Sequence, residues 1–106
     1  MPRRTILTMR RAGKVDDTQR EIVHALRAAG ATVQSLASVG KGVPDILIGL
    51  EGVNLLAEIK DGAKSKSRRK LTWDELNWHR TWKGQVVIIE SIEDALDLVK
   101  KLGRTS

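Results

Sequence analysis

Three side chains in the middle of this chain have the types and spacing needed to hydrolyse a phosphate ester. Asp45 ends the stretch Gly42-Val43-Pro44-Asp45, and Glu58-Ile59-Lys60 begins thirteen residues later. Carboxylates are ligands that Mg²⁺ accepts, and water bound to such an ion becomes a nucleophile as its pKa falls. A lysine beside them can orient that water or stabilise the charge that builds on the phosphate.

Two apolar strands are expected to position these groups, at 45–50 and 54–60, joined by the turn 51–53. Both segments are apolar on both faces, which is typical of central strands. If they pair antiparallel around a four-residue turn, Asp45 lies opposite Lys60 and diagonal to Glu58, at roughly 7–8 Å. All three side chains then project from one face. The alternative is a buried ion pair of Lys60 with Glu58 or Asp45 that does no chemistry.

The protein ligands of the ion would be Asp45, Glu58 and the backbone carbonyl of Ile59. Glu21 is a possible fourth, because the first helix places it beside the apolar stripe, at the rim facing the sheet. Its alternative role is to complement the dipole of that helix.

The remaining pattern predicts an α/β fold with a mixed sheet and the order α-β-β-β-α-β-α. A helix capped by Asp16 or Asp17 runs to about residue 29, where Gly30 ends it. A strand at 32–37 and a glycine-rich loop at 38–44 follow. Thr72 and Glu75 predict a capping box for a helix that reaches about residue 82.

After that helix we expect a short buried strand at 85–89, and then a last helix capped by Ser91. Its expected apolar face consists of Ile92, Ala95, Leu96, Val99 and Leu102.

Charge points to a polyanionic partner, since 19 basic residues oppose 13 acidic ones and the net charge is +6. The expected phosphate contacts lie in the glycine-rich loop and in the polar loop 61–70: Lys41, Lys64, Lys66, Arg68, Arg69 and Lys70. Such contacts would hold a nucleic acid without reading its sequence. Residues 1–14 contain five basic residues and no acid. They are predicted to be a solvated tail, or an arm that touches phosphate or a partner subunit, and residues 5–9 are expected to form a short strand. The alternative for the loop 61–70 is likewise a solvated surface without phosphate contacts.

Other classes of protein are excluded by what the sequence lacks. It has no cysteine for a disulfide, a thiolate metal site or a nucleophile, no apolar run long enough for a membrane span, and no signal-peptide pattern. We therefore expect a cytoplasmic protein with no membrane contact and no small-molecule cofactor.

These residues resemble the PD-(D/E)XK nuclease superfamily, and within it the virus-type replication-repair nuclease (VRR-NUC) domain in its short stand-alone phage form. The matching landmarks are the helix with Glu21, Pro44-Asp45, Glu58-Ile59-Lys60, the helix with Trp78-His79, and the strand that follows Gly84. The resemblance covers most of the predicted domain, 15–103, and implies a restriction-endonuclease-like core.

The resemblance implies a metal-dependent DNA endonuclease that uses Mg²⁺, with Mn²⁺ as a substitute. Asp45, Glu58 and Lys60 would match its catalytic positions and Glu21 its helix acid. Stand-alone members are similar to Holliday junction resolvases and act as homodimers, which suggests branched DNA as substrate and a phage or prophage in a bacterial host as source. The alternatives are a nuclease for flap, nicked or linear duplex DNA, and a non-catalytic DNA-binding module. Glu75 stands where the family often has Gln, which leaves its role open between the helix cap and the lysine.

Overall fold

The computed structural model describes residues 16–104 and confirms the predicted order of the main elements. These are α1 (Asp17–Ala28), β2 (Thr32–Ser35), β3 (Ile46–Leu50), β4 (Val53–Ile59), α2 (Lys66–Arg69), α3 (Trp73–Thr81), β5 (Val86–Ile89) and α4 (Ile92–Arg104). The predicted basic tail 1–14, with its short strand at 5–9, lies outside the described residues. The one-turn helix α2 was not predicted, because the polar sequence around it has no apolar periodicity.

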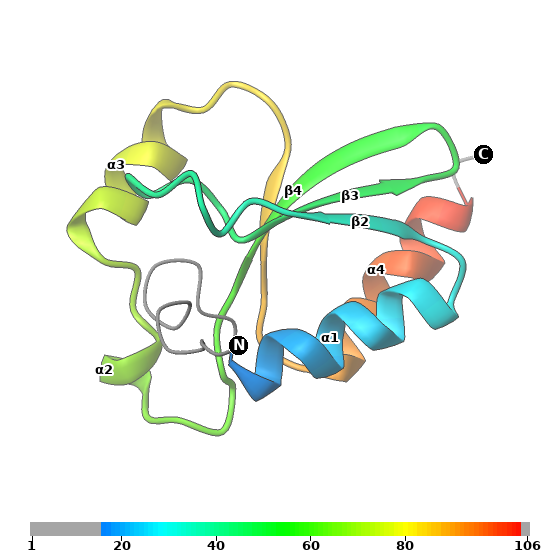
Figure 1. Ribbon diagram of the computed structural model, residues 1–106, viewed down its shortest axis with the longest axis horizontal. Helices are drawn as coiled ribbons and strands as arrows, with labels where there is room; N and C mark the ends of the chain where they lie inside the picture. The colour runs from blue at the N-terminus through cyan, green and yellow to red at the C-terminus, as the bar shows by residue number, and fades with distance from the viewer. Residues whose placement is uncertain (1–15, 105–106) are drawn as a thin grey trace, which may run out of the picture.

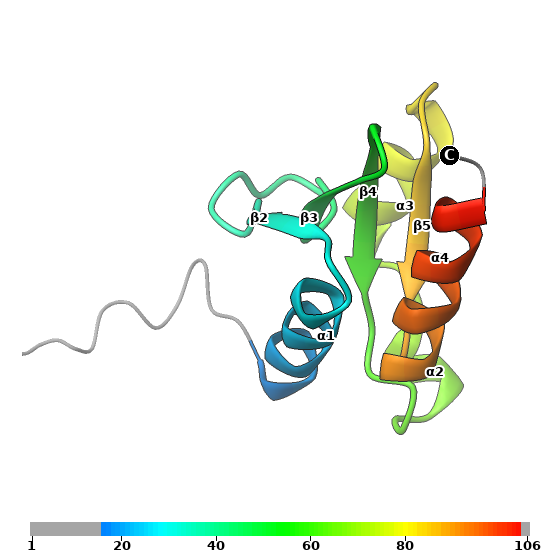
Figure 2. The ribbon, with the colours of Figure 1, turned by 90° about the vertical axis from the view of Figure 1, so that its right-hand side faces the viewer.

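The four strands form one mixed sheet in the order β2-β3-β4-β5. The first three are antiparallel, and β5 runs parallel to β4 after the crossover through α3. The apolar strands β3 and β4 are central, as predicted. Figure 1 shows α3 at one end of the strands, well away from α1 and α4, and Figure 2 shows β4 and β5 side by side with α4 beyond β5.

The predicted register of the β3–β4 hairpin is wrong by two residues. Leu50 pairs with Val53, so the turn consists of Glu51 and Gly52 alone. Both have positive φ, at 52° and 79°, which is the conformation of a tight type I′ hairpin turn. Because the shift is even, every side chain keeps the face that was predicted for it.

The apolar core lies on the side of the sheet that α1 and α4 cover. Ile46 and Ile48 of β3 are completely buried, and they pack with Ile22 and Leu26 of α1 and Ala95 of α4. Ala57 and Ile59 of β4 belong to the same cluster. Since side chains alternate along a strand, Glu58 between them must face the other side.

Local signals set the helix ends as expected. Asp16 caps α1 by accepting a 2.9 Å hydrogen bond from the Gln19 N–H. After Ala29, Gly30 takes φ +104°, and its N–H and that of Ala31 donate to carbonyls of the last turn. The predicted capping box of Thr72 and Glu75 begins α3, and the Ser91 hydroxyl accepts a bond from the Asp94 N–H at the start of α4.

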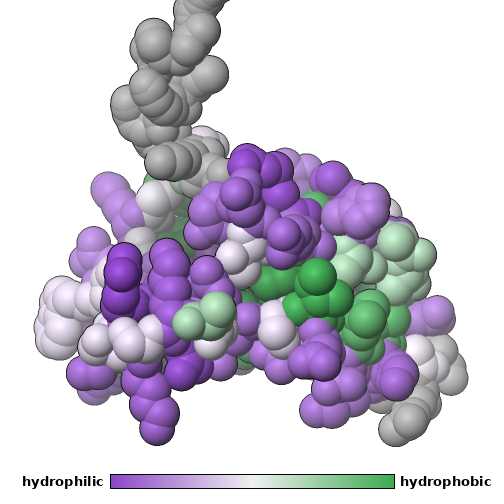
Figure 3. Space-filling view, turned by 90° about the horizontal axis from the view of Figure 1, so that it is seen from below, coloured by the Kyte–Doolittle hydropathy of each residue, from purple (hydrophilic) through white to green (hydrophobic). Residues whose placement is uncertain are grey.

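Two expectations about burial are corrected. β5 is an edge strand, not a buried one, and Ile88 is 45% exposed. On α4, Ile92 and Leu96 also stay exposed, because the helix turns Ala95, Leu98 and Val99 toward the core instead. Figure 3 views the underside of the molecule and shows an apolar area bordered by hydrophilic residues.

Within residues 16–104, no helix combines the length and the apolarity needed to cross a membrane.

Candidate active site

The carboxyl groups of Asp45 and Glu58 lie side by side where the β3–β4 hairpin opens. Ile46 pairs with Ala57, so Asp45, one residue before β3, lies opposite Glu58 rather than opposite Lys60 as predicted. Ile46 and Ala57 are both in the core, which places Asp45 and Glu58 together on the other face. The predicted convergence is therefore confirmed, with a closer arrangement than the diagonal one expected.

Asp45 extends the β3–β4 ladder with its side chain just before β3 begins. Its Oδ2 accepts a 2.7 Å hydrogen bond from the Ile59 N–H. In a strand the N–H and C=O of one residue point the same way, so the Ile59 carbonyl also points toward Asp45. The next amide, of Lys60, turns to the opposite neighbour and donates to the Ile89 carbonyl at 3.0 Å. This alternation directs the Ile59 carbonyl, an expected ligand of the ion, to the same side of β4 as Asp45.

Glu58 is one of the most buried charged side chains of the described residues, at 2% exposure. Burial, together with the neighbouring negative charges of Asp45 and Glu75, raises the pKa of its carboxyl to about 9. Burial also raises the pKa of Asp45, although the Ile59 hydrogen bond acts in the opposite direction. At neutral pH, without a cation, Glu58 therefore holds a proton that an exposed glutamate would have lost.

Lys60 is held by Glu75 rather than by Glu58. Its Nζ donates to Glu75 Oε1 at 2.8 Å, while Glu58 Oε2 is 3.9 Å away. The same Oε1 accepts the Thr72 N–H at 2.8 Å, so Glu75 caps α3 and orients the lysine at once. Burial raises the pKa of Glu75, but the bonds from Lys60 and Thr72 outweigh it and leave that pKa below its ordinary value. Both roles left open for Glu75 by the sequence are present.

His79 lies at the site, although the sequence analysis named it only within a family landmark and gave it no catalytic or metal-binding role. It follows Glu75 by one helical turn, so both lie on the same face of α3. Its Nε2 is buried and lies 4.0 Å from Glu58 Oε1, and neither atom has a hydrogen-bond partner. Burial lowers the pKa of His79, which favours the neutral imidazole. The one-turn spacing from Glu75 was the available signal.

The helix that carries Glu75 and His79 is positioned by polar contacts and by the glycine-rich loop. No residue of α3 is fully buried. The loop packs directly on its first turn at Gly42, where a Cβ atom would lie 2.2 Å from the Asp74 carbonyl oxygen. Gly42 also has φ +81°, a conformation that favours glycine. The loop thus fixes the distance between Asp45 at its end and α3.

This arrangement fits a divalent cation. Two adjacent carboxyl groups, one of them with a pKa near 9, repel each other unless a proton or a positive ion lies between them. Glu58 Oε1 has no hydrogen-bond partner. The Ile59 carbonyl shares the side of β4 on which the Ile59 N–H meets Asp45. Oxygen donors of this kind suit Mg²⁺ or Mn²⁺. Within residues 16–104, no three acidic, histidine or cysteine side chains already stand at metal-holding distances, so further oxygens would have to complete the coordination.

Glu21 lies outside this group. It is exposed and lines a separate cavity of about 530 Å³ with Asp61, Arg69 and Glu90, among others, whose lining includes neither Asp45 nor Glu58. The cause is that α1 packs its apolar stripe on the opposite face of the sheet. The structure therefore does not bring Glu21 to the carboxyl pair.

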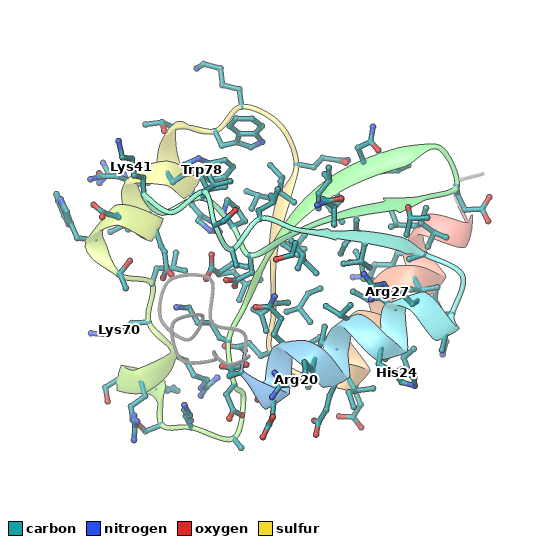
Figure 4. The ribbon with its side chains drawn as sticks, in the orientation of Figure 1. Arg20, His24, Arg27, Lys41, Lys70 and Trp78 are labelled. Carbon is teal, nitrogen blue, oxygen red and sulfur yellow. The ribbon has the colours of Figure 1, made fainter. Side chains whose placement is uncertain are left out.

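The basic residues expected to contact phosphate fall into two groups. Lys41, Lys64, Lys66, Arg68 and Lys70 are exposed. Arg69 is instead held in place, with Nε donating to the Lys64 carbonyl at 2.9 Å and a guanidinium nitrogen 3.2 Å from Glu90 Oε2. In Figure 4, Lys41 and Lys70 both lie at the α3 end of the molecule, while Arg20, His24 and Arg27 follow α1. Cationic side chains therefore flank the helix that covers the acidic pair.

Comparison of the chain with protein-family models, with curated proteins and with solved structures found no match. What the chain does must therefore be argued from the site itself.

Proposed function

We propose that this chain is a metal-dependent DNA endonuclease with a restriction-endonuclease-like core, of the kind the resemblance to VRR-NUC domains implies. The observation that carries the proposal is the acidic pair of Asp45 and Glu58 beside Lys60. A protein gains nothing in stability from burying a carboxyl group whose pKa is driven to about 9. A site that must hold a cation next to a phosphate has a reason to keep it.

In this proposal each side chain has a role at a named atom. Asp45, Glu58 and the Ile59 carbonyl hold the ion. When bound, Mg²⁺ or Mn²⁺ activates a water and neutralises charge on the phosphate. Lys60, oriented by Glu75 at 2.8 Å, stabilises the negative charge that develops on the phosphate oxygens. Buried surroundings strengthen that interaction, because few waters compete for the ammonium group.

The duplex backbone would cross the α3 end of the molecule, where Lys41 and Lys70 lie (Figure 4). The exposed Lys64, Lys66 and Arg68 precede Lys70 in the chain and would add phosphate contacts. We propose a branched substrate such as a four-way junction, because its two symmetry-related cuts suit a twofold dimer. The exposed apolar residues Ile92 and Leu96, one turn apart on α4, supply surface that a second copy could bury. Such an enzyme would act on DNA in a bacterial cytoplasm, which agrees with the phage-like resemblance.

The test uses labelled four-way junction, flap, nicked duplex, linear duplex and single-stranded DNA, each with Mg²⁺, Mn²⁺ or EDTA. We expect junction cleavage that depends on the metal and falls at least about a thousandfold in Asp45→Asn, with DNA binding retained. Asp74→Asn, a change of the same type at an exposed position of α3, is the matched control. Equal cleavage of every DNA would remove the junction preference, and binding without cleavage of any would favour a non-catalytic module.

A further inference from the structure

Two buried polar atoms face each other across the site without partners. Among residues 16–104, Glu58 Oε1 and His79 Nε2 are the buried side-chain atoms that lack any hydrogen bond. Their side chains are only 3% and 13% exposed. An unpaired buried polar atom costs about 1–3 kcal/mol, so two at one point call for a missing third participant.

The separation of the two atoms indicates what that participant is. At 4.0 Å they are too far apart for a direct hydrogen bond. The distance is close to twice the roughly 2.0–2.1 Å bond that Zn²⁺ makes to an imidazole nitrogen, and Zn²⁺ bonds to carboxylate oxygens are about as long. A single ion between them would therefore contact both. The ring of Trp78 packs edge-on against the imidazole, with centroids 5.8 Å apart, and restricts its rotation.

We infer that His79 Nε2 and Glu58 Oε1 together bind a divalent transition metal, so that the site prefers Mn²⁺, Co²⁺ or Zn²⁺ to Mg²⁺. This inference rests on the proposed function, since Glu58 belongs to both ligand sets. Its two oxygens connect the Asp45 side of the site with the His79 side. An imidazole nitrogen binds Co²⁺ and Zn²⁺ well and Mn²⁺ less strongly, but it binds all three more readily than Mg²⁺, which strongly prefers oxygen. The Ile59 carbonyl, water and phosphate oxygens would complete the coordination.

The experiment measures Mg²⁺, Mn²⁺ and Co²⁺ binding by calorimetry on metal-stripped protein without DNA. Wild type is compared with His79→Gln, Glu58→Gln and His24→Gln, which changes the other histidine of the chain on the exposed face of α1. We expect His79→Gln to weaken Mn²⁺ and Co²⁺ at least about tenfold and Mg²⁺ less than about threefold. Glu58→Gln should abolish binding of all three ions, and His24→Gln should change none.

A second measurement needs no variant and covers the case in which His79→Gln fails to fold. On addition of Zn²⁺ to wild-type protein, the ¹⁵N resonance of His79 Nε2 should shift as expected for a metal-bound nitrogen, while that of His24 stays in place. An unshifted His79 resonance, or an equal loss of Mn²⁺ and Mg²⁺ affinity in His79→Gln, would overturn the inference.

The outcomes separate the two proposals. DNA cleavage with an unchanged Mn²⁺ to Mg²⁺ ratio in His79→Gln removes only the histidine ligand. Binding of Mn²⁺ that depends on His79, without cleavage of any DNA, removes only the nuclease. A wild-type protein that binds no divalent ion removes both.

Discussion

The two faces of β4 differ sharply, although their residues alternate along one strand. On the α1–α4 face, Ala57 and Ile59 pack in a cluster whose members are almost completely buried and apolar. On the α3 face, Glu58 carries a pKa raised to about 9 and lies 4.0 Å from an unpaired histidine nitrogen. The difference shows that the apolar α1–α4 face supplies most of the stability of the sheet. The α3 face can therefore keep polar groups whose burial costs free energy.

The sharpest test of this division compares neighbouring apolar residues of β3. Ile48 is completely buried on the α1–α4 face, whereas Leu47 is half-buried on the other. We expect Ile48→Ala to lower the free energy of unfolding by about 4 kcal/mol and Leu47→Ala by about 1–2 kcal/mol, because less contact is lost. Urea unfolding measures both. Equal losses would mean that the two faces contribute alike.

Replacing the buried acid should stabilise the protein. The folded pKa of Glu58 is raised from 4.5 to about 9, so the native state binds more protons than the unfolded state between these values, and stability falls as pH rises through that window. In EDTA, Glu58→Gln should raise the free energy of unfolding by about 3 kcal/mol at pH 7 and more at pH 9, with little gain at pH 4.

The measurement is thermal and urea unfolding of both proteins across that pH range. If Glu58→Gln were less stable than wild type at pH 9, the ionised Glu58 carboxylate would have favourable partners in the folded protein. Its burial on the α3 face would then not destabilise the fold. Adding Mn²⁺ should stabilise wild type and leave Glu58→Gln unchanged, since only the carboxylate binds the ion.

The contact between the glycine-rich loop and α3 can be tested with two glycines of the same loop. Gly42→Ala places a Cβ 2.2 Å from the Asp74 carbonyl oxygen and strains a φ of +81°, whereas Gly40→Ala strains a φ of +73° with nothing within 4 Å. We expect losses of about 2–3 kcal/mol for Gly42→Ala and about 1 kcal/mol for Gly40→Ala by urea unfolding. Similar losses would show that the loop does not position α3.

The smallest effect is expected where Glu75 links the α3 cap to Lys60. Glu75→Gln and Asp74→Asn each remove one negative charge from the first turn, but only Glu75 contacts the lysine, at 2.8 Å. Glu75→Gln should therefore cost about 1 kcal/mol more than Asp74→Asn at pH 7, measured by urea unfolding. If the two variants are equally stable, the Lys60–Glu75 contact contributes nothing on this face.

Much of the fold could be predicted because its signals are local. The Thr72–Glu75 capping box, Gly30 after α1 and the apolar strands around Glu51-Gly52 each depend on a few adjacent residues. The hairpin register was missed because sliding one strand past the other by two residues leaves every apolar side chain on the same face. The apolar pattern therefore fits both registers, and the tight turn at Glu51 and Gly52, with positive φ at both, decides between them. The exposure of Ile92 and Leu96 was missed because the apolar face that periodicity predicts for α4 is wider than the face that the helix buries.

The part of the site that lies on the strands could be predicted, because side chains alternate between the two faces of a strand. Asp45, Glu58 and Lys60 needed only two paired strands to be placed on one face. Glu21 and His79 belong to helices, whose rotation and docking depend on packing far along the chain. The sequence therefore favoured Glu21, which lines another cavity, over His79, whose Nε2 lies 4.0 Å from Glu58.

The bond from the Ile59 amide to Asp45 Oδ2 has a consequence for cation choice. With that oxygen engaged by the backbone, Asp45 would meet an ion in the proposed site mainly through its other oxygen, as a monodentate ligand. Calcium commonly collects six to eight oxygens at about 2.3–2.6 Å, often through bidentate carboxylates, whereas smaller six-coordinate ions accept single oxygens readily. In the proposed site, this one amide bond would therefore disfavour calcium by limiting the carboxylate oxygens available to the ion.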